Sequence, residues 1–220
     1  MVQINKSTLE FLNGLKKNNN RDWFLKNQSG YKEAKNNFES FVQDLINGVV
    51  AFDPIMKGLE VKNCVFRINR DVRFSNDKSP YKTNFGAFIV RGGKKNGDKF
   101  AGYYFHIEPG GSMIAGGAYV PPSPWLGAIR EIISDEPEKF LKLIQAKDFI
   151  KYFGTLQGEK LKTAPKGYPS DHPQIELLKL KSYLAMNEVS DNEVLKPGFF
   201  EHVVNVFKVM KPLNDFLNNY

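Results

Sequence analysis

Residues 66–82, FRINRDVRFSNDKSPYK, bring arginines, aspartates and lysines together in one short segment. Arg67 and Arg73 carry planar guanidinium groups, which bind a carboxylate or a phosphate through paired hydrogen bonds. Lys78 and Lys82 would add point charges from the loop that follows, and loops commonly carry binding residues. The composition of this segment therefore predicts a site for a small phosphate- or carboxylate-bearing molecule.

The alternation of residue types suggests how these charges are presented. If residues 64–74 form a strand, successive side chains point to opposite faces. Arg67, Asp71 and Arg73 then share a polar face, whereas Arg70 falls on the apolar face. An arginine in that position needs either a bulge that redirects it or a carboxylate partner.

A second polar face is expected in residues 100–108, where Tyr104, His106 and Glu108 alternate with apolar residues. If this face meets the arginine segment, a phenol, an imidazole and a carboxylate converge on the cations. In an enzyme, the arginines would stabilise developing negative charge. The candidates for moving protons are Asp71, His106 and Tyr81. The predicted ligand contacts are Arg67, Arg70, Arg73, Asp77, Lys78 and Lys82.

The same residues also fit two other classes of function. In a protein-interaction domain they would form a structural network, with pairs such as Arg67–Asp71, Arg70–Glu108 and Arg73–Asp77. In a nucleic-acid-binding module, these cations and the lysines of residues 94–99 would contact phosphates while Tyr103 or Tyr104 stacks on a base.

The remaining histidine patterns predict structural roles. Asp171-His172-Pro173 precedes a short apolar helical segment, so Asp171 or His172 is expected to cap that helix. A catalytic His172 oriented by Asp171 is the alternative. His106 and Glu108 alone do not make a metal site, so none is predicted. The glycines match neither the phosphate-loop nor the dinucleotide pattern, and the sequence leaves any cofactor unknown.

The elements that hold these groups follow the order helix, strand, helix. Ser7 and Glu10 fit a capping box at the start of the first helix. Apolar steps of three and four residues predict helices over 7–17, 21–49, 125–133, 137–144 and 199–217. A period of two predicts strands over 61–74, 85–90, 100–108 and 112–119, with a hairpin turn at Asn96-Gly97. The predicted fold is α+β, with a central antiparallel meander covered by N- and C-terminal helices.

The composition is that of an ordinary globular protein, and the 220 residues fit one domain over 1–220. A net charge of +7 favours contact with polyanions. No apolar run could cross a bilayer, and the first residues lack a secretory leader. We therefore expect a cytoplasmic protein with no membrane partner.

The arginine segment also carries a family resemblance, in the pattern R-x-x-R-D-x-R-F-x-x-D-K-x-x-Y over residues 67–81. This pattern resembles the signature of a bacterial conserved-hypothetical family, the domain of unknown function twenty-four sixty-one. Residues 19–24, 116–119, 165–173 and 181–183 are also similar to that family, so the resemblance covers essentially the whole chain. It implies that the residues of the pattern act as a unit, but it supplies no reaction.

Overall fold

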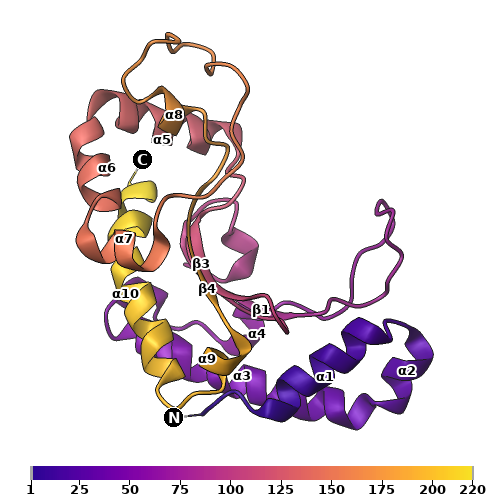
Figure 1. The fold of residues 1–220 in the computed structure, drawn as a ribbon. Helices are drawn as coiled ribbons and strands as arrows, with labels where there is room; N and C mark the ends of the chain where they lie inside the picture. Colours follow the sequence, from indigo (N-terminus) through magenta and orange to yellow (C-terminus); the bar gives the residue numbers. More distant parts are fainter. Residues whose placement is uncertain (1, 220) are drawn as a thin grey trace.

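The fold is that of a computed structural model, which describes residues 2–219 (Figure 1). One antiparallel sheet contains β1 (Phe85–Ile89), β2 (Gly102–Ile107), β3 (Ser112–Ala118) and β4 (Tyr183–Val189), in the order β1-β2-β3-β4. Each strand pairs with the next along the chain. The predicted α+β fold with a central antiparallel meander is therefore confirmed.

Helices flank the strands, as expected, but some of them lie in the chain between β3 and β4. Those before β1 are α1 (Lys6–Lys17), α2 (Arg21–Lys26), α3 (Gln28–Val50) and α4 (Val61–Cys64). Those after β3 are α5 (Ser123–Asp135), α6 (Pro137–Ile144), α7 (Lys147–Phe153), α8 (Ile175–Leu178), α9 (Asp191–Val194) and α10 (Phe199–Leu217). Short 3₁₀ helices occupy Pro54–Met56 and Lys94–Asn96. None of the helices in residues 2–219 combines the length and apolarity needed to span a bilayer.

Helices α3 and α10 cover one face of the sheet. On that face Phe105 of β2 stacks on Phe38 and Phe41 of α3, and Tyr103 packs on Phe207 of α10. All five side chains are fully buried. They belong to the main hydrophobic core, and burial of apolar surface is the dominant favourable term in folding.

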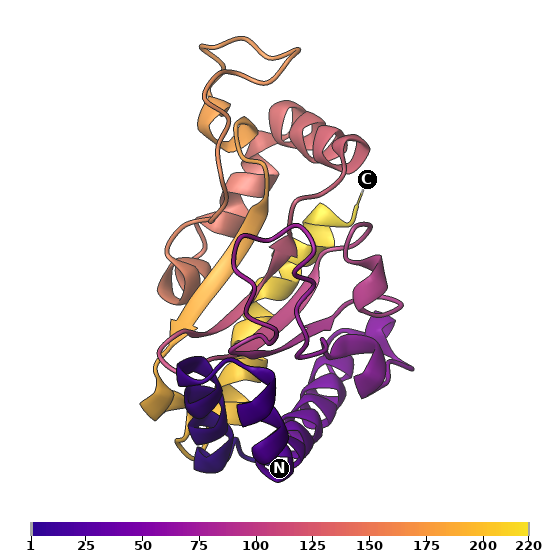
Figure 2. The same ribbon diagram turned by 90° about the vertical axis from the view of Figure 1, so that its right-hand side faces the viewer.

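Figure 2 looks onto the opposite face, whose centre no described helix covers. We call it the open face. Because side chains alternate along a strand, the residues that pair beside Tyr104 and His106 of β2 point to the same side. The open face is formed by Gly86, Phe88, Tyr104, His106, Met113, Ala115, Leu184, Met186 and Glu188.

The strand predicted over residues 61–74 is wrong. Residues 61–64 form α4, and residues 66–84, which we call the arginine segment, form an irregular loop with two arms. The amide of Lys82 donates to the Ile68 carbonyl at 2.8 Å, and that of Arg70 donates to the Pro80 carbonyl at 3.0 Å. Phe74, which the alternation placed on an apolar face, is 96% exposed. A strand there would lack the buried face that stabilises its register.

Other departures from the predicted elements have local causes. The prediction of a hairpin turn at Asn96-Gly97 is wrong, because a long loop with a 3₁₀ helix joins β1 to β2. The helix predicted over 21–49 is interrupted at Asn27, which separates α2 from α3. The capping box is also wrong: α1 begins at Lys6, and the Ser7 hydroxyl donates to Glu33 instead.

Strand β4 was not predicted, because its sequence hides the period of two. Tyr183 and Ala185 are buried on the helix-covered face, while Leu184 and Met186 are half-buried on the open face. A strand with apolar residues on both faces shows no clear alternation. By contrast, the prediction that the last helix continues through Pro212 to Leu217 is confirmed.

Candidate functional site

The arginine segment satisfies many of its own charges. The Arg70 guanidinium pairs with Asp77, and the Arg73 guanidinium donates to both oxygens of Asp71, at 2.9 and 2.7 Å. These contacts replace the pairs Arg70–Glu108 and Arg73–Asp77 of the predicted network. Because exposed ion pairs differ little in energy, spacing alone does not select the partner.

The outer part of the segment is further tied together around Asp77. Its carboxylate accepts hydrogen bonds from the amide and hydroxyl of Ser79, which together with Arg70 hold the pKa of Asp77 well below its usual range. The Lys78 ammonium donates to the Val72 carbonyl at 3.0 Å. Hydrogen bonds from Arg73 likewise lower the pKa of Asp71. Asp71 is therefore a carboxylate at neutral pH and a weak proton acceptor.

Tyr81 anchors the segment to the N-terminal helices. Its ring is buried and stacks on Phe24 of α2, with ring centres 4.0 Å apart. The side chain of Asn19 accepts a hydrogen bond from the Tyr81 amide at 3.1 Å and donates one to the Tyr81 carbonyl at 2.8 Å. The sequence did not identify Asn19 as this anchor, although Asn19 lies in one of the segments that resemble the family.

Two cations of the segment lie nearer the sheet than the paired arginines. Lys82 is half-buried, and its ammonium lies 5.2 Å from the centre of the Phe66 ring. Burial lowers the pKa of Lys82, and repulsion from the Arg67 guanidinium lowers it further. Within residues 2–219, neither Arg67 nor Lys82 has a carboxylate within ion-pair distance.

On the open face, three side chains of β2 and its end form a hydrogen-bonded row. The Tyr104 hydroxyl lies 2.9 Å from His106 Nδ1, and His106 Nε2 lies 3.2 Å from Glu108 Oε2. The Thr83 hydroxyl donates to Glu108 Oε1 at 2.6 Å, and the Lys16 ammonium is 4.0 Å from that same oxygen. This confirms the prediction that Tyr104, His106 and Glu108 share one face.

The electrostatics of this row fix the direction of its hydrogen bonds. Burial lowers the pKa of His106, against the opposing effect of Glu108, so the imidazole is neutral near pH 7. A carboxylate only accepts, so the Nε2 hydrogen points to Glu108 and Nδ1 accepts from the Tyr104 hydroxyl. Burial, followed by the charge of Glu108, raises the pKa of Tyr104 to about 12.

The arginine segment and the row meet on the open face. Lys82 is one of the charges that act on His106, and the Phe66 ring lies edge-on to Tyr104 with centres 6.4 Å apart. In Figure 2 the arginine segment passes in front of the sheet. The charge of Lys82 thus acts on His106, and the charge of Arg67 acts on both Lys82 and Asp71. The contacts of Arg70, Arg73, Asp77 and Lys78 lie within the segment itself, and Tyr81 packs in the core.

His172 is held in a structural setting. Its Nδ1 accepts a hydrogen bond from the Gln174 amide at 3.0 Å. In the neutral ring the hydrogen therefore lies on Nε2, which donates to the Ser134 hydroxyl at 3.1 Å. In this tautomer His172 cannot take a proton from Ser134. The helix predicted to be capped by Asp171 or His172 begins later, at Ile175, with Gln174 as its N-cap.

The two candidate stacking residues of the nucleic-acid alternative differ in exposure. Tyr103 is fully buried beneath α10, and its hydroxyl donates to the buried Asp53 carboxylate at 2.8 Å. It therefore cannot stack on a base. Tyr104 lies on the open face and is half-buried.

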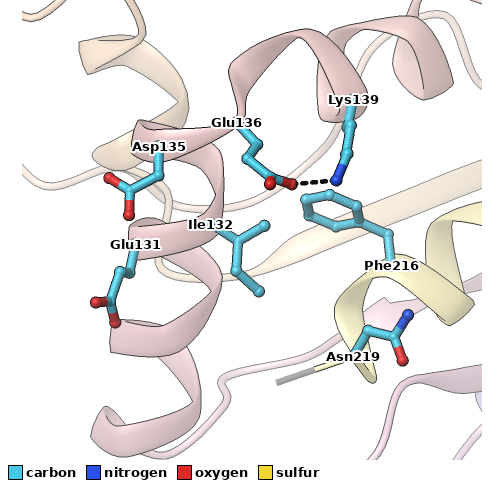
Figure 3. A pocket seen from close by; sticks show the side chains of 7 residues that line it. All are labelled: Glu131, Ile132, Asp135, Glu136, Lys139, Phe216 and Asn219. Atoms are coloured by element: carbon cyan, nitrogen blue, oxygen red, sulfur yellow. Dashed lines mark ion pairs between the residues drawn. The ribbon is translucent and has the colours of Figure 1, made fainter.

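Two hollows lie on the surface, and neither is lined by Arg67, Lys82 or His106. One, of about 510 Å³, lies between α5, α6 and the end of α10 (Figure 3); it is lined by Glu131, Ile132, Asp135, Glu136, Lys139, Phe216 and Asn219. Its single lysine pairs with Glu136 at 2.5 Å. The other, of about 690 Å³, is lined by residues 110–113 and 188–192, so it adjoins the open face at Met113 and Glu188; its charged groups are Glu188 and Asp191. Carboxylates dominate both hollows, so neither suits an anion.

Comparison with known proteins places the chain in a family. A family model described as "Conserved hypothetical protein (DUF2461)" matches residues 7–216. The chain belongs to this family. The expected family is therefore confirmed, over nearly the whole sequence, and the family description names no activity. Searches of curated proteins and of solved structures found no match to the chain.

Proposed function

We propose that this DUF2461 protein binds a small phosphate- or carboxylate-bearing molecule at Arg67 and Lys82, over the open face beside His106. The observation that carries the proposal is that Arg67 and Lys82, two cations that act on each other electrostatically, both lack a carboxylate within ion-pair distance among the described residues. Like charges that lie close together repel, more strongly where burial removes water. An anion between them would relieve that repulsion.

The two cations suit different parts of one anionic group. The Arg67 guanidinium offers a planar pair of donors, and the Lys82 ammonium is a point charge that burial has partly stripped of water. Phe66, beneath the Lys82 ammonium, supports the alkyl chain and ammonium from the other side. The ligand would then lie against the row that begins with Tyr104.

The remaining charges of the arginine segment would hold its shape. Arg70 and Arg73 already have carboxylate partners, and Lys78 is bonded to a backbone carbonyl. Breaking these contacts to reach a ligand would cost part of what binding gains. We therefore assign them to the scaffold and assign Arg67 and Lys82 to the ligand.

The test is thermal unfolding with inorganic phosphate, pyrophosphate, citrate, nucleoside monophosphates and a short oligonucleotide. A ligand at about 100 times its dissociation constant stabilises the folded protein by about 2.7 kcal/mol. We expect one small anion to raise the midpoint in wild type and to have no effect in Arg67→Met or Lys82→Met. Arg73→Met is the matched control, because it removes the same charge from the same segment.

The outcomes separate the three classes of function. If Arg73→Met loses the ligand effect while Arg67→Met keeps it, the anion binds at the outer part of the segment and the assignment is wrong. If only the oligonucleotide stabilises the protein, and its effect falls steeply with salt, the protein is a nucleic-acid-binding module. If no anion acts and both arginine variants unfold earlier, the segment is a structural network.

A further inference from the structure

The row on the open face has the donor and acceptor order of a nucleophile, its base and an orienting carboxylate. Glu108 receives the His106 Nε2 hydrogen, and His106 Nδ1 receives the Tyr104 hydroxyl hydrogen. The same order of roles, with a different hydroxyl, activates serine nucleophiles on unrelated folds. Such an arrangement is recognised by the positions of the nucleophile, base and carboxylate in space, and not by their order in the sequence.

The support around Glu108 fixes the orienting end of the row. Thr83 donates to one carboxylate oxygen, which leaves the other for the His106 ring. The Ser112 hydroxyl bridges the Glu108 amide and carbonyl, each at 3.0 Å, and so holds the backbone. Partners of this kind lock the tautomer of an imidazole. His106 is thereby held with its free lone pair toward Tyr104.

The position of the Tyr104 hydroxyl depends on Gly86, the partner of His106 on β1. A Cβ atom at residue 86 would lie 2.9 Å from that hydroxyl. The absence of a side chain thus lets the phenol lie flat across the neighbouring strand and reach His106 Nδ1. Tyr104 is half-buried on the open face, and Lys82 lies near enough to act on His106.

We propose that Tyr104 is the nucleophile of a group-transfer reaction on an anionic phosphate ester, with His106 as its base and Glu108 as a positioning residue. The inference rests on the proposed anion site, because Arg67 and Lys82 would hold the non-bridging oxygens. Those oxygens carry the charge in a phosphoryl transition state. The two cations would therefore stabilise the reaction as well as binding.

The step balances without a further reactant. The Tyr104 oxygen forms a bond to phosphorus, and the hydroxyl proton moves to His106 Nδ1. The bond from phosphorus to the leaving oxygen breaks, and that oxygen takes the electron pair and then the proton from His106. The products are phosphorylated Tyr104 and a free alcohol. Attack by water in the second step releases phosphate and returns a proton to the Tyr104 oxygen.

The test uses covalent labelling by an aryl sulfonyl fluoride, whose tetrahedral sulfur and fluoride leaving group imitate the attacked phosphoryl group. Mass spectrometry then measures the labelling rate at each tyrosine. Tyr119 is the internal reference, because it is 70% exposed and no hydrogen bond joins it to an imidazole among the described residues. At pH 7 we expect Tyr104 to be labelled at least about tenfold faster than Tyr119, despite its burial, because a positioned base contributes about 10²–10⁴-fold.

The pH profile separates base catalysis from a structural role. The groups that face His106 are Tyr104, Glu108 and Lys82, with Lys16 behind Glu108. Labelling of Tyr104 should reach a plateau once His106 is deprotonated, because burial lowers the pKa of His106 below its ordinary 6.5. An ordinary phenol reacts through its phenolate, so its labelling should instead rise with pH up to about 10. If Tyr104 instead reacted as a phenolate, its labelling would keep rising toward its own raised pKa of about 12, and such a profile would overturn the proposal.

Variants provide the second readout. His106→Gln should lower Tyr104 labelling about 100-fold, and Glu108→Gln should lower it less while keeping an acceptor for Nε2. Thermal unfolding of each variant shows whether the protein is folded, and Glu108→Gln remains a test if His106→Gln is not. We call the proposed transfer of the Tyr104 proton to His106, oriented by Glu108, the relay. If a folded variant of either kind labels Tyr104 at the wild-type rate, the relay is refuted.

Two versions of the probe distinguish failure of this inference from failure of the anion site. A neutral sulfonyl fluoride tests the relay alone, whereas one carrying a carboxylate should also be drawn to Arg67 and Lys82. If only the neutral probe shows fast labelling that depends on His106, the relay stands and the anion site is wrong. If neither labels Tyr104 faster than Tyr119, the relay is wrong.

Discussion

Substitution of Gly86 by alanine should disconnect Tyr104 from His106 while leaving the protein folded. The new Cβ atom would lie 2.9 Å from the Tyr104 hydroxyl and 3.4 Å from the nearest ring carbon. Ordinary contacts begin near 3.4 Å, so the hydroxyl must retreat by about half an ångström. The hydrogen bond to His106 Nδ1, now 2.9 Å, would then lengthen to about 3.4 Å, outside the usual range for such bonds, and would weaken.

The expected change in stability is small because two effects oppose each other. Losing a hydrogen bond costs about 0.5–1.5 kcal/mol. Replacing glycine by alanine at a compatible backbone position gains about 0.4–1 kcal/mol, because the unfolded chain has fewer conformations. The atom that must move is the end of a side chain, and it can rotate away from the strand. The free energy of unfolding should therefore change by less than about 1 kcal/mol.

The assay combines chemical denaturation with sulfonyl fluoride labelling. Tyr104 labelling should fall at least about tenfold in Gly86→Ala, a change that corresponds to about 1.4 kcal/mol in the barrier. Gly127→Ala, in α5, is the matched control, because its Cβ would meet no atom within 4 Å. That control should gain up to about 1 kcal/mol of stability and label as wild type does. If Gly86→Ala is folded and labels Tyr104 at the wild-type rate, contact between Tyr104 and His106 does not control reactivity.

Two further predictions concern pH and the core. Burial lowers the pKa of His106 from its ordinary 6.5, so the unfolded chain binds a proton more readily; wild type should lose stability as the pH falls through 6.5. The midpoint of urea unfolding from pH 8 to 5 should fall less in His106→Gln, and equal slopes would contradict the assignment of a neutral buried imidazole. Tyr81→Phe keeps the ring on Phe24 and should change stability by less than about 0.5 kcal/mol, whereas Tyr81→Ala should cost about 3–5 kcal/mol. If Tyr81→Phe is as unstable as Tyr81→Ala, the hydroxyl and not the ring holds the segment.

The polar row was predictable because strand geometry is local. Side chains two residues apart on a strand lie on the same face, so Tyr104, His106 and Glu108 could be grouped without knowing any partner. The spacing did not show that the Tyr104 hydroxyl reaches His106, which depends on Gly86 of another strand. It also did not show which face of β2 the helices cover. Tyr103 and Tyr104 therefore remained equal candidates for stacking.

The arginine segment shows the opposite case. Its composition predicted a cluster of charges, but its pairing within the segment could not be predicted. Arg73 forms an ion pair with Asp71, and Arg70 forms one with Asp77. Both pairs lie in a loop whose two arms are held together by backbone hydrogen bonds such as that between Lys82 and Ile68. Exposed ion pairs differ by about 1 kcal/mol or less, so neither spacing nor residue type could select among them.

The sequence by itself determined the fold class, the family pattern and the residue types that could do chemistry, because these depend on local periodicity and on composition. Tertiary structure decided which groups act together. It buried Tyr103 under α10, stacked Tyr81 on Phe24 and left Arg67 and Lys82 without a carboxylate within ion-pair distance among the described residues. Contacts between residues far apart in the chain arise only when the hydrophobic core forms. Within residues 2–219, folding placed the arginine segment in front of the face of the sheet that the helices leave open, which is the face that carries His106.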